Sequence, residues 1–190
     1  MPRTSRTRYA VLFLLRNSPM SGYDIKKSCE LFLGHFWGES FGQIYPVLKR
    51  LEQDGAVEVM AGPEPGTRNR KVYRITPAGH RILRGWLEQP PALPSIRDEL
   101  LLKLSCGNEV DRDVHIRNLQ QARDDTLKEL QEFVQLEITY LADYGAAADL
   151  PYWLITLRAG RSSREARVRW CDESIAALRS LERKPDEKHG

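Results

Sequence analysis

The spacing of hydrophobic positions changes several times along the chain, and the clearest pattern lies between residues 40 and 54. Ile44, Leu48 and Leu51 recur at intervals of three and four residues, which places them on one face of a helix. Polar and cationic side chains fall on the opposite face. The pattern predicts an amphipathic helix over 40–54 that seats one face in a core and leaves the other face free.

The two ends of this helix have residues that are typical of helix termini. Ser40 and Gln43 have the spacing of a capping box, in which each side chain satisfies a backbone N–H at a helix start. Gly55 is the residue type at which a chain commonly leaves a helix. Because Pro46 lacks the N–H that a helix interior needs, the start is left open between residue 40 and residue 42.

Two strand-like segments follow this helix. Residues 56–61 alternate between apolar and polar positions, residues 62–67 form a turn-rich break, and residues 68–75 alternate again. A helix followed by such a hairpin is a helix with a β-wing, here over 56–75. The loop and the return strand carry cations that a hairpin does not need for its structure: Arg68, Arg70, Lys71 and Arg74.

Two further helical patterns precede the central helix. Residues 8–17 are apolar on nearly all sides, which predicts a helix that is packed deep in a small domain or shared with a dimer partner. Ser21 and Asp24 form a second capping box and open a helix to about residue 34. Two helices joined by a short connection, the second with an exposed polar face, make a helix-turn-helix arrangement.

A proline-rich segment separates this unit from the rest of the chain. Thr76 and Pro77 are typical of an N-cap and a first helical position, and they predict a helix through Leu87. The prolines that follow cannot continue a helix and stiffen a linker. We expect a winged helix-turn-helix domain over 1–89, a linker over 90–95 and a helical domain over 96–190.

The second half is helical throughout, with a short helix near 96–105 and two long helices over 111–144 and 151–183. The first long helix would be about 50 Å long, and so small a domain cannot cover its apolar stripe. An antiparallel hairpin that serves dimerisation is therefore expected. The positions of the last helix predicted to be buried are Leu154, Leu157, Val168, Cys171, Ile175, Leu178 and Leu181. The predicted fold class is mainly α with a small β-wing.

The charge is divided unequally between the two halves. Residues 1–90 contain 14 Lys and Arg against 8 Asp and Glu, a balance of +6, whereas residues 91–190 contain 15 against 18, a balance of −3. The cation excess lies in the half with the helix-turn-helix, as expected if that half alone meets a polyanion.

Several functional classes lack their sequence signals. No apolar run approaches the ~20 residues of a membrane span, and no signal peptide is evident, so we expect a cytoplasmic protein without membrane partners. The 3 Cys and 4 His are scattered, which indicates neither disulfides nor a metal site, and no cofactor is expected. No catalytic motif or phosphate-binding loop is present, so the chain is not expected to be an enzyme.

Three motifs together give the sequence a resemblance to a known family. Residues 21–25 read SGYDI, residues 42–52 read GQIYPVLKRLE, and residues 70–79 read RKVYRITPAG. The chain resembles the PadR family of transcriptional regulators, in the long form with an AphA-like C-terminal helical domain. The resemblance is looser beyond residue 88. It implies a homodimer that binds an inverted repeat in double-stranded DNA, often as a repressor and often released by a small molecule.

The DNA-contacting residues are expected on the central helix and the wing. Gln43 is a candidate amide reader of bases, Lys49 and Arg50 are candidate guanine readers or phosphate clamps, and Tyr45 is a candidate phosphate donor. The wing cations are expected to meet phosphates or the minor groove. The full set is Lys26, Ser40, Gln43, Tyr45, Pro46, Lys49, Arg50, Arg68, Arg70, Lys71 and Tyr73. Lys26 and Lys27, on the helix that Ser21 opens, are weaker candidates than the residues of the central helix and the wing. The competing interpretation of each is a solvated surface position.

An effector pocket is a separate hypothesis. Aromatic residues of the long helices, among them Tyr140, Trp153 and Trp170, form a candidate site for a small aromatic ligand, although aromatics at helical spacing more often belong to a core. The alternative function is a winged-helix protein-interaction module without DNA specificity. The DNA-binding regulator and the protein-interaction module differ in how their binding affinity depends on salt, because phosphate contacts weaken steeply as ionic strength rises.

Overall fold

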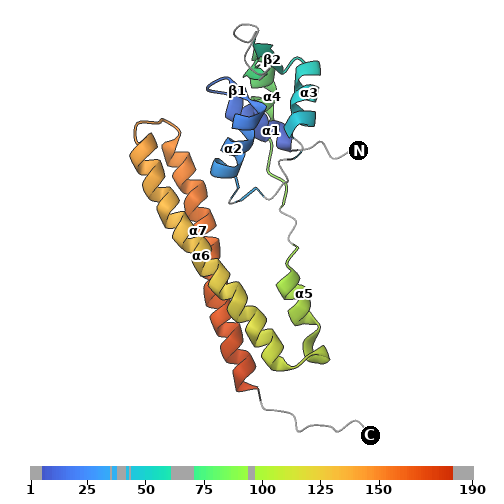
Figure 1. Ribbon diagram of the computed structural model, residues 1–190, viewed down its shortest axis with the longest axis vertical. Helices are drawn as coiled ribbons and strands as arrows, with labels where there is room; N and C mark the ends of the chain where they lie inside the picture. The colour runs from blue at the N-terminus through green and yellow to red at the C-terminus, as the bar shows by residue number, and fades with distance from the viewer. Residues whose placement is uncertain are drawn as a thin grey trace. The chain divides into compact units, whose positions relative to one another are not determined.

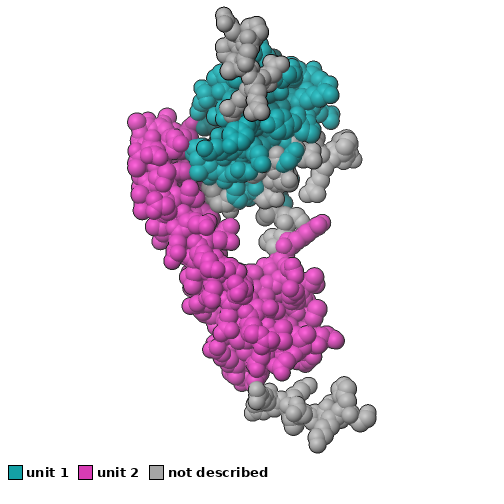
Figure 2. Space-filling model, in the orientation of Figure 1, with its two compact units in different colours: residues 1–94 teal, residues 95–190 magenta. Residues whose placement is uncertain are grey.

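The computed structural model describes residues 6–34, 36–37, 42, 44–60, 71–93 and 97–181. Two compact units divide the chain between residues 94 and 95, and Figure 2 colours them separately. The first unit contains helices and a small sheet, and the second contains helices (Figure 1). The predicted class, mainly α with a small wing, is confirmed.

Unit 1 contains four α-helices and three short strands within its described residues. In chain order these are α1 (Thr7–Leu15), β1 (Met20–Ser21), α2 (Gly22–Phe32), α3 (Ile44–Gln53), β2 (Val57–Met60), β3 (Val72–Ile75) and α4 (Pro77–Leu87). Helix α3 corresponds to the helix predicted over 40–54 but begins at Ile44. Both of its predicted capping residues, Ser40 and Gln43, lie outside the described part of the chain.

The sheet ties the wing to the start of α2. Its strand order is β1-β3-β2 with antiparallel pairing, in which Met60 lies opposite Val72 and Met20 lies opposite Tyr73. The two wing strands were expected, but β1 was not, since a two-residue strand has no alternation to recognise. Through β1 the return strand of the wing is joined directly to the N-terminus of α2.

Two of the three N-caps predicted for this unit, Ser21 and Thr76, are confirmed, and the third, Ser40, lies outside the described residues. The Asp24 N–H donates to Ser21 Oγ, and the Ser21 N–H donates to Asp24 Oδ2, each over 3.3 Å. At α4, the Gly79 N–H donates to Thr76 Oγ1 over 3.1 Å, and the Thr76 hydroxyl donates to the Gly55 carbonyl over 2.7 Å. Thr76 therefore joins α4 to the turn that ends α3, where Gly55 has a φ of 67°.

One hydrophobic core holds unit 1 together. Helix α1 is buried around most of its circumference, as its sequence predicts, with Val11, Leu12 and Leu15 almost completely enclosed. The aromatic rings of Tyr9 and Trp86 stack 4.5 Å apart and join α1 to α4. The α2, α3 and sheet residues that complete the core are Ile25, Cys29, Leu33, Ile44, Leu48, Leu51, Ala56, Val57, Tyr73 and Ile75.

Unit 2 is built on an antiparallel pair of long helices. Its elements are α5 (Glu99–Ser105), the short 3-10 turn η2 (Gly107–Glu109), α6 (Arg112–Tyr144) and α7 (Leu150–Ser180). Helices α6 and α7 lie side by side (Figure 1), and the break between them is where the sequence places it. The described residues of this unit contain no strand.

The hairpin leaves part of its apolar surface uncovered in a single chain. Val134, Ile138 and Leu141 on α6 are each about half exposed. On α7 the burial predicted for Leu157, Cys171 and Ile175 is confirmed, while Leu154, Val168 and Leu178 are half-buried. The prediction for Leu181 is wrong, because this residue lies just past the end of α7 and is 58% exposed.

Neither a membrane span nor a metal cluster occurs in the described residues. No helix there combines the length and the apolar character that a bilayer crossing requires. No group of three or more His, Cys, Asp or Glu side chains is arranged to hold a metal ion in the same residues.

Candidate nucleic-acid interface

Helix α3 presents a fixed polar face. Ile44, Leu48 and Leu51 are 1% exposed or less, so the helix cannot roll about its axis without removing three side chains from the core. Burial of each such side chain stabilises the fold by about 1.5–3 kcal/mol. The opposite face exposes Tyr45, Pro46, Lys49 and Arg50, as the sequence predicts. The orientation of the polar face is therefore set by the core.

The cations of this face are available for an external partner. Neither Lys49 nor Arg50 forms an ion pair with any residue that the structure describes. Lys26 on α2 is also exposed, but it lies 3.8 Å from Glu30 one turn further along the same helix. Exposed pairs of this kind are worth less than about 1 kcal/mol, so Lys26 can exchange Glu30 for another anion.

The wing shows a similar division among its cations. Lys71 is exposed immediately before β3 and forms no ion pair within the described residues. Arg74 instead donates from Nη2 and Nε to Glu58 Oε1 across the strand pair, over 2.7 and 2.9 Å. Arg74 is therefore engaged in holding β2 to β3. Arg68 and Arg70, the other two wing candidates, lie outside the described residues, as do Ser40 and Gln43 of the central helix.

The position of Tyr73 does not fit a direct role at the interface. Its side chain is 7% exposed and belongs to the core, because β3 turns Tyr73 and Ile75 to the same buried face. Burial raises the pKa of the Tyr73 hydroxyl, and the nearby Glu52 and Tyr45 raise this pKa further. The period of two along the strand, which groups Tyr73 with the apolar Ile75, is the signal that indicates this burial.

Tyr45 is placed by a neighbour that sequence reasoning did not single out. Its ring lies across Gly22, the first residue of α2, so that a Cβ at residue 22 would be 2.7 Å from Tyr45 Cε1. The Tyr45 side chain is nevertheless 61% exposed. The ring therefore packs against the backbone of α2 on one side and faces solvent on the other.

The three aromatic residues predicted to form one effector site in unit 2 do not come together. Tyr140 and Trp153 lie 6.2 Å apart between ring centroids, and Tyr144 completes an edge-to-face cluster with both. Trp170 is 17 residues beyond Trp153 on the same helix, about 25 Å along its axis. One small molecule cannot contact both Trp153 and Trp170.

Trp170 lines a different feature, an open groove of about 670 Å³ between α5, α6 and α7. Arg167 lies over the Trp170 ring, 4.6 Å from its centroid, and donates from Nη1 to Asp98 Oδ2 over 2.6 Å. The hydrogen bond from Arg167 lowers the pKa of Asp98, which also caps α5 by accepting from the Leu101 N–H. Other lining residues are Leu101, Ala122, Asp125, Thr126, Glu129, Ser163, Arg164 and Ala166.

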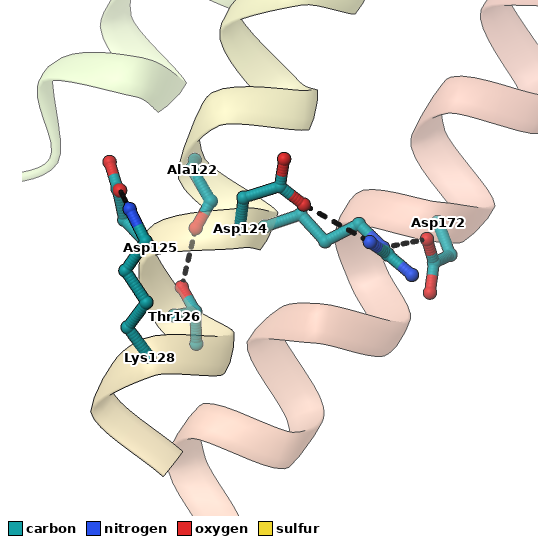
Figure 3. Close-up of polar contacts among 7 residues, drawn as sticks. Ala122, Asp124, Asp125, Thr126, Lys128 and Asp172 are labelled. Carbon is teal, nitrogen blue, oxygen red and sulfur yellow. Dashed lines mark hydrogen bonds and ion pairs between the residues drawn. The ribbon is translucent and has the colours of Figure 1, made fainter. Parts of the chain in front are cut away.

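Beside this groove an ion pair joins α6 to α7, and several further polar contacts lie within α6 (Figure 3). Arg123 donates from Nε to Asp172 on α7 and from Nη1 to Asp124, over 2.5 and 3.2 Å. Thr126 donates to the Ala122 carbonyl over 2.6 Å, and Lys128 pairs with Asp125 over 3.0 Å. The charged side chains of this region therefore have partners within unit 2.

Comparison with known proteins identifies both units. The sequence family described as "Transcriptional regulator PadR-like family" matches residues 11–85, and the family described as "Virulence activator alpha C-term" matches residues 96–179. The negative transcriptional regulator PadR of Bacillus subtilis is 28% identical over 176 residues, which cover 90% of this chain and 96% of the relative.

Solved structures of relatives match along almost the whole chain. Bacillus subtilis PadR in complex with operator DNA superposes with a TM-score of 0.81 at 25% identity, over 92% of this chain and 98% of that one. The structure of the same protein in complex with p-coumaric acid superposes with a TM-score of 0.73 at 25% identity, over 91% of this chain and 98% of that one. The Vibrio cholerae virulence activator AphA superposes with a TM-score of 0.73 at 28% identity, over 92% of this chain and 99% of that one. The chain belongs to the PadR-like family of transcriptional regulators, which are not enzymes, in the form that carries an AphA-like C-terminal domain.

Proposed function

We propose that this protein is a dimeric repressor that reads an inverted-repeat operator with the recognition helix 40–54 and the wing 56–75. The observation that carries the proposal is the polar face of α3, on which Lys49 and Arg50 are exposed and unpaired within the described residues while the opposite face is fixed in the core. The description of the Bacillus subtilis relative as a negative regulator supports repression.

The recognition helix fits the dimensions of the DNA major groove. An α-helix with its side chains is about 10–12 Å across, and the major groove is about 12 Å wide. Lys49 and Arg50 would contact guanine edges or phosphates, and the Tyr45 hydroxyl would donate to a phosphate. Gln43, Ser40 and Pro46 are proposed to line the same contact, as the sequence predicts.

The remaining predicted contacts are on the wing and α2. Lys71 is proposed to meet a phosphate, as are Arg68 and Arg70, which lie outside the described residues. Lys26 would do the same once it has exchanged its partner Glu30 for the phosphate. Tyr73 acts from within the core, where it supports β3 instead of touching DNA. Binding to DNA places the protein in the compartment that holds the DNA, so we assign it to the cytoplasm.

A second copy of the chain is the partner that the uncovered stripe requires. Val134, Ile138 and Leu141 are half exposed along one face of α6, and Ile155 is exposed on α7. Pairing two hairpins would remove these residues from water, at about 25 cal/mol for each Å² of apolar surface buried. A dimer also presents two recognition helices, which can enter successive major grooves about 34 Å apart.

A small aromatic acid is the proposed releasing ligand. The structure of Bacillus subtilis PadR with p-coumaric acid supports this class of effector. In this chain the Trp170 groove combines an aromatic wall with Arg164 and Arg167, which an acid would have to share with their partners Glu129 and Asp98. The cluster of Tyr140, Tyr144 and Trp153, by contrast, is closely packed. We therefore favour the groove over the cluster.

The test is a fluorescence anisotropy titration with DNA fragments selected from a random pool. Changing Lys49 and Arg50 together to Ala removes the unpaired cations of α3. Binding should weaken by at least roughly 30-fold, because two contacts of about 1–3 kcal/mol each contribute about 2–6 kcal/mol together. The matched control changes Lys128 and Arg169 to Ala, which removes the same charge from exposed positions of unit 2. Equal binding by the two double variants would contradict the proposed interface.

The alternative function, a protein-interaction module, makes a different prediction for salt. Each phosphate neutralised by a cation gives a fall of about 0.9 log units in affinity for a tenfold rise in salt. A regulator that uses Lys49, Arg50 and the wing cations should show a steep slope, and the Ala variant should show a shallower one. A slope near zero would favour the interaction module.

A further inference from the structure

The contact between Gly22 and Tyr45 is closer than any other residue at position 22 would allow. A Cβ built on Gly22 would lie 2.7 Å from Tyr45 Cε1 and 3.3 Å from both Cδ1 and Cζ. Gly22 is not needed for its backbone conformation, because among the described residues only Gly55 and Gly107 have a positive φ. The nearest obstacle to a side chain at residue 22 is therefore the Tyr45 ring.

The backbones on both sides of this contact are held in place. Ser21, immediately before Gly22, pairs with Val72 in the sheet and forms the capping box with Asp24. On the other side, Ile44 precedes Tyr45 and is 1% exposed in the core. Because neither α2 nor α3 can withdraw at low cost, a side chain added at residue 22 must displace the Tyr45 ring.

The displaced ring would not return to an equivalent position. Tyr45 and Glu52 are electrostatic neighbours of Tyr73, which is buried on β3. Tyr73 in turn lies opposite Met20, two residues before Gly22. The Tyr45 ring therefore lies against the start of α2, with the buried Tyr73 of the wing nearby, and its open direction is solvent.

We propose that Gly22 is a positioning residue for DNA binding, which holds the Tyr45 ring against α2 so that its hydroxyl meets a DNA phosphate. This inference rests on the proposed DNA-binding function and adds to it a specific contribution from α2. Gly22 itself makes no contact with DNA in this account. Its effect on affinity passes entirely through Tyr45.

The experiment measures DNA affinity by anisotropy for Gly22→Ala, Tyr45→Phe, Tyr45→Ala and the double variant Gly22→Ala/Tyr45→Ala. The matched control is Gly85→Ala, since a Cβ at this α4 position meets no atom within 4 Å. Gly22→Ala and Tyr45→Phe should each weaken binding by roughly tenfold, the loss expected for a hydrogen bond to a charged group. Gly85→Ala should bind as the parent chain does.

Three further readouts distinguish the positioning of Tyr45 by Gly22 from a purely structural role of Gly22. The melting temperature of Gly22→Ala should not fall, because Ala at the start of a helix is tolerated and the ring can rotate away. The slope of affinity against salt should not change, because no cation is removed. In the Tyr45→Ala background, Gly22→Ala should cause no additional loss.

Two results would overturn the inference while leaving the proposed function intact. One is that Gly22→Ala binds DNA as tightly as the parent chain, while the separate Lys49→Ala/Arg50→Ala variant binds it more weakly. The other is an equal loss from Gly22→Ala with and without Tyr45. If the parent chain shows no salt-dependent DNA binding at all, the proposed function itself fails, and this inference fails with it.

Discussion

The ring of Phe133 on α6 lies directly against Gly160 on α7. A Cβ at residue 160 would be 2.6 Å from Phe133 Cε1 and 2.8 Å from Cζ, and Phe133 is buried. The guanidinium of Arg164 lies over the same ring at 5.3 Å from its centroid. The close approach of the two long helices at this point therefore depends on the absence of a side chain at residue 160.

Gly160→Ala should destabilise the hairpin, although Ala is ordinarily the better helix residue. The gain in helix propensity is about 1 kcal/mol, whereas overpacking a core costs about 1–3 kcal/mol, so a net loss of about 1 kcal/mol is expected. Urea denaturation followed by circular dichroism measures it. Gly85→Ala, at an open helical position, should instead stabilise, and Phe133→Leu should relieve the loss in Gly160→Ala. A Gly160→Ala variant more stable than the parent would show that the contact is not tight.

Thr76→Ala should destabilise unit 1. The change removes the cap on Gly79 and the hydrogen bond to the Gly55 carbonyl, and the expected cost is about 1–2 kcal/mol. Thr76→Ser should retain most of the stability. The control is Thr156→Ala on α7, whose hydroxyl bonds only within its own exposed helical turn. The measurement is the melting temperature of each of the three variants. Equal melting temperatures for Thr76→Ala and Thr156→Ala would argue against the cap.

One of the three cysteine thiols should react rapidly with an alkylating reagent, and the other two should react slowly. Cys106 is exposed, whereas Cys29 and Cys171 are buried. Burial raises the pKa of the Cys29 thiol to about 12, with a smaller contribution from Glu30, and burial also raises the pKa of Cys171. Because the thiolate is the reactive form, iodoacetamide at pH 8 should modify Cys106 alone in the native chain.

Mass spectrometry of the modified peptides gives the measurement. In denaturant all three thiols should react, with Cys29 reporting the opening of unit 1 and Cys171 reporting that of unit 2. Rapid modification of Cys29 under native conditions would mean that the α2 core opens readily.

Asp98→Asn should change the pH dependence of unit 2. The hydrogen bond from Arg167 lowers the pKa of Asp98 in the folded chain below its ordinary value of 3.8. The ion pair therefore stabilises the fold above about pH 4, and this contribution is lost as the pH falls through the lower folded pKa. Asn retains the N-cap but not the charge, so the variant should be about 1 kcal/mol less stable at pH 7.

The difference between the parent and Asp98→Asn should disappear in acid. Urea denaturation from pH 7 down to pH 2 measures the difference as a function of pH. The parallel variant Asp143→Asn removes an exposed carboxylate of α6 that forms no ion pair with a described residue. A constant difference across the whole pH range would show that the charge of Asp98 is not involved.

Local periodicity predicted the parts of the fold that depend on one element at a time. The spacing of Ile44, Leu48 and Leu51 identified the buried face of α3, and Ser21 and Thr76 marked the starts of two helices. Strand β1 was missed because two residues have no period. Through β1 the wing is tied to α2, which no pattern within either segment indicates.

Contacts between distant segments were beyond the sequence patterns. Asp98 and Arg167 are separated by 69 positions and meet because α5 packs beside the hairpin, a placement that neither residue signals alone. Gly22 looked like part of a helix start, and its contact with Tyr45 depends on the angle between α2 and α3. The separation of Trp153 from Trp170, by contrast, follows from helix length and was available from the sequence.

The spacing of the two half-sites distinguishes a dimer that reads an inverted repeat from single chains that bind each half-site independently. A selected operator is compared by anisotropy with a version in which five base pairs are inserted between its two half-sites. Because two recognition helices held by one dimer enter grooves on the same face of the duplex, the insertion turns one half-site to the opposite face. We expect the altered operator to bind no more tightly than a single half-site. Equal affinity for the two operators would contradict a dimer that reads an inverted repeat with α3.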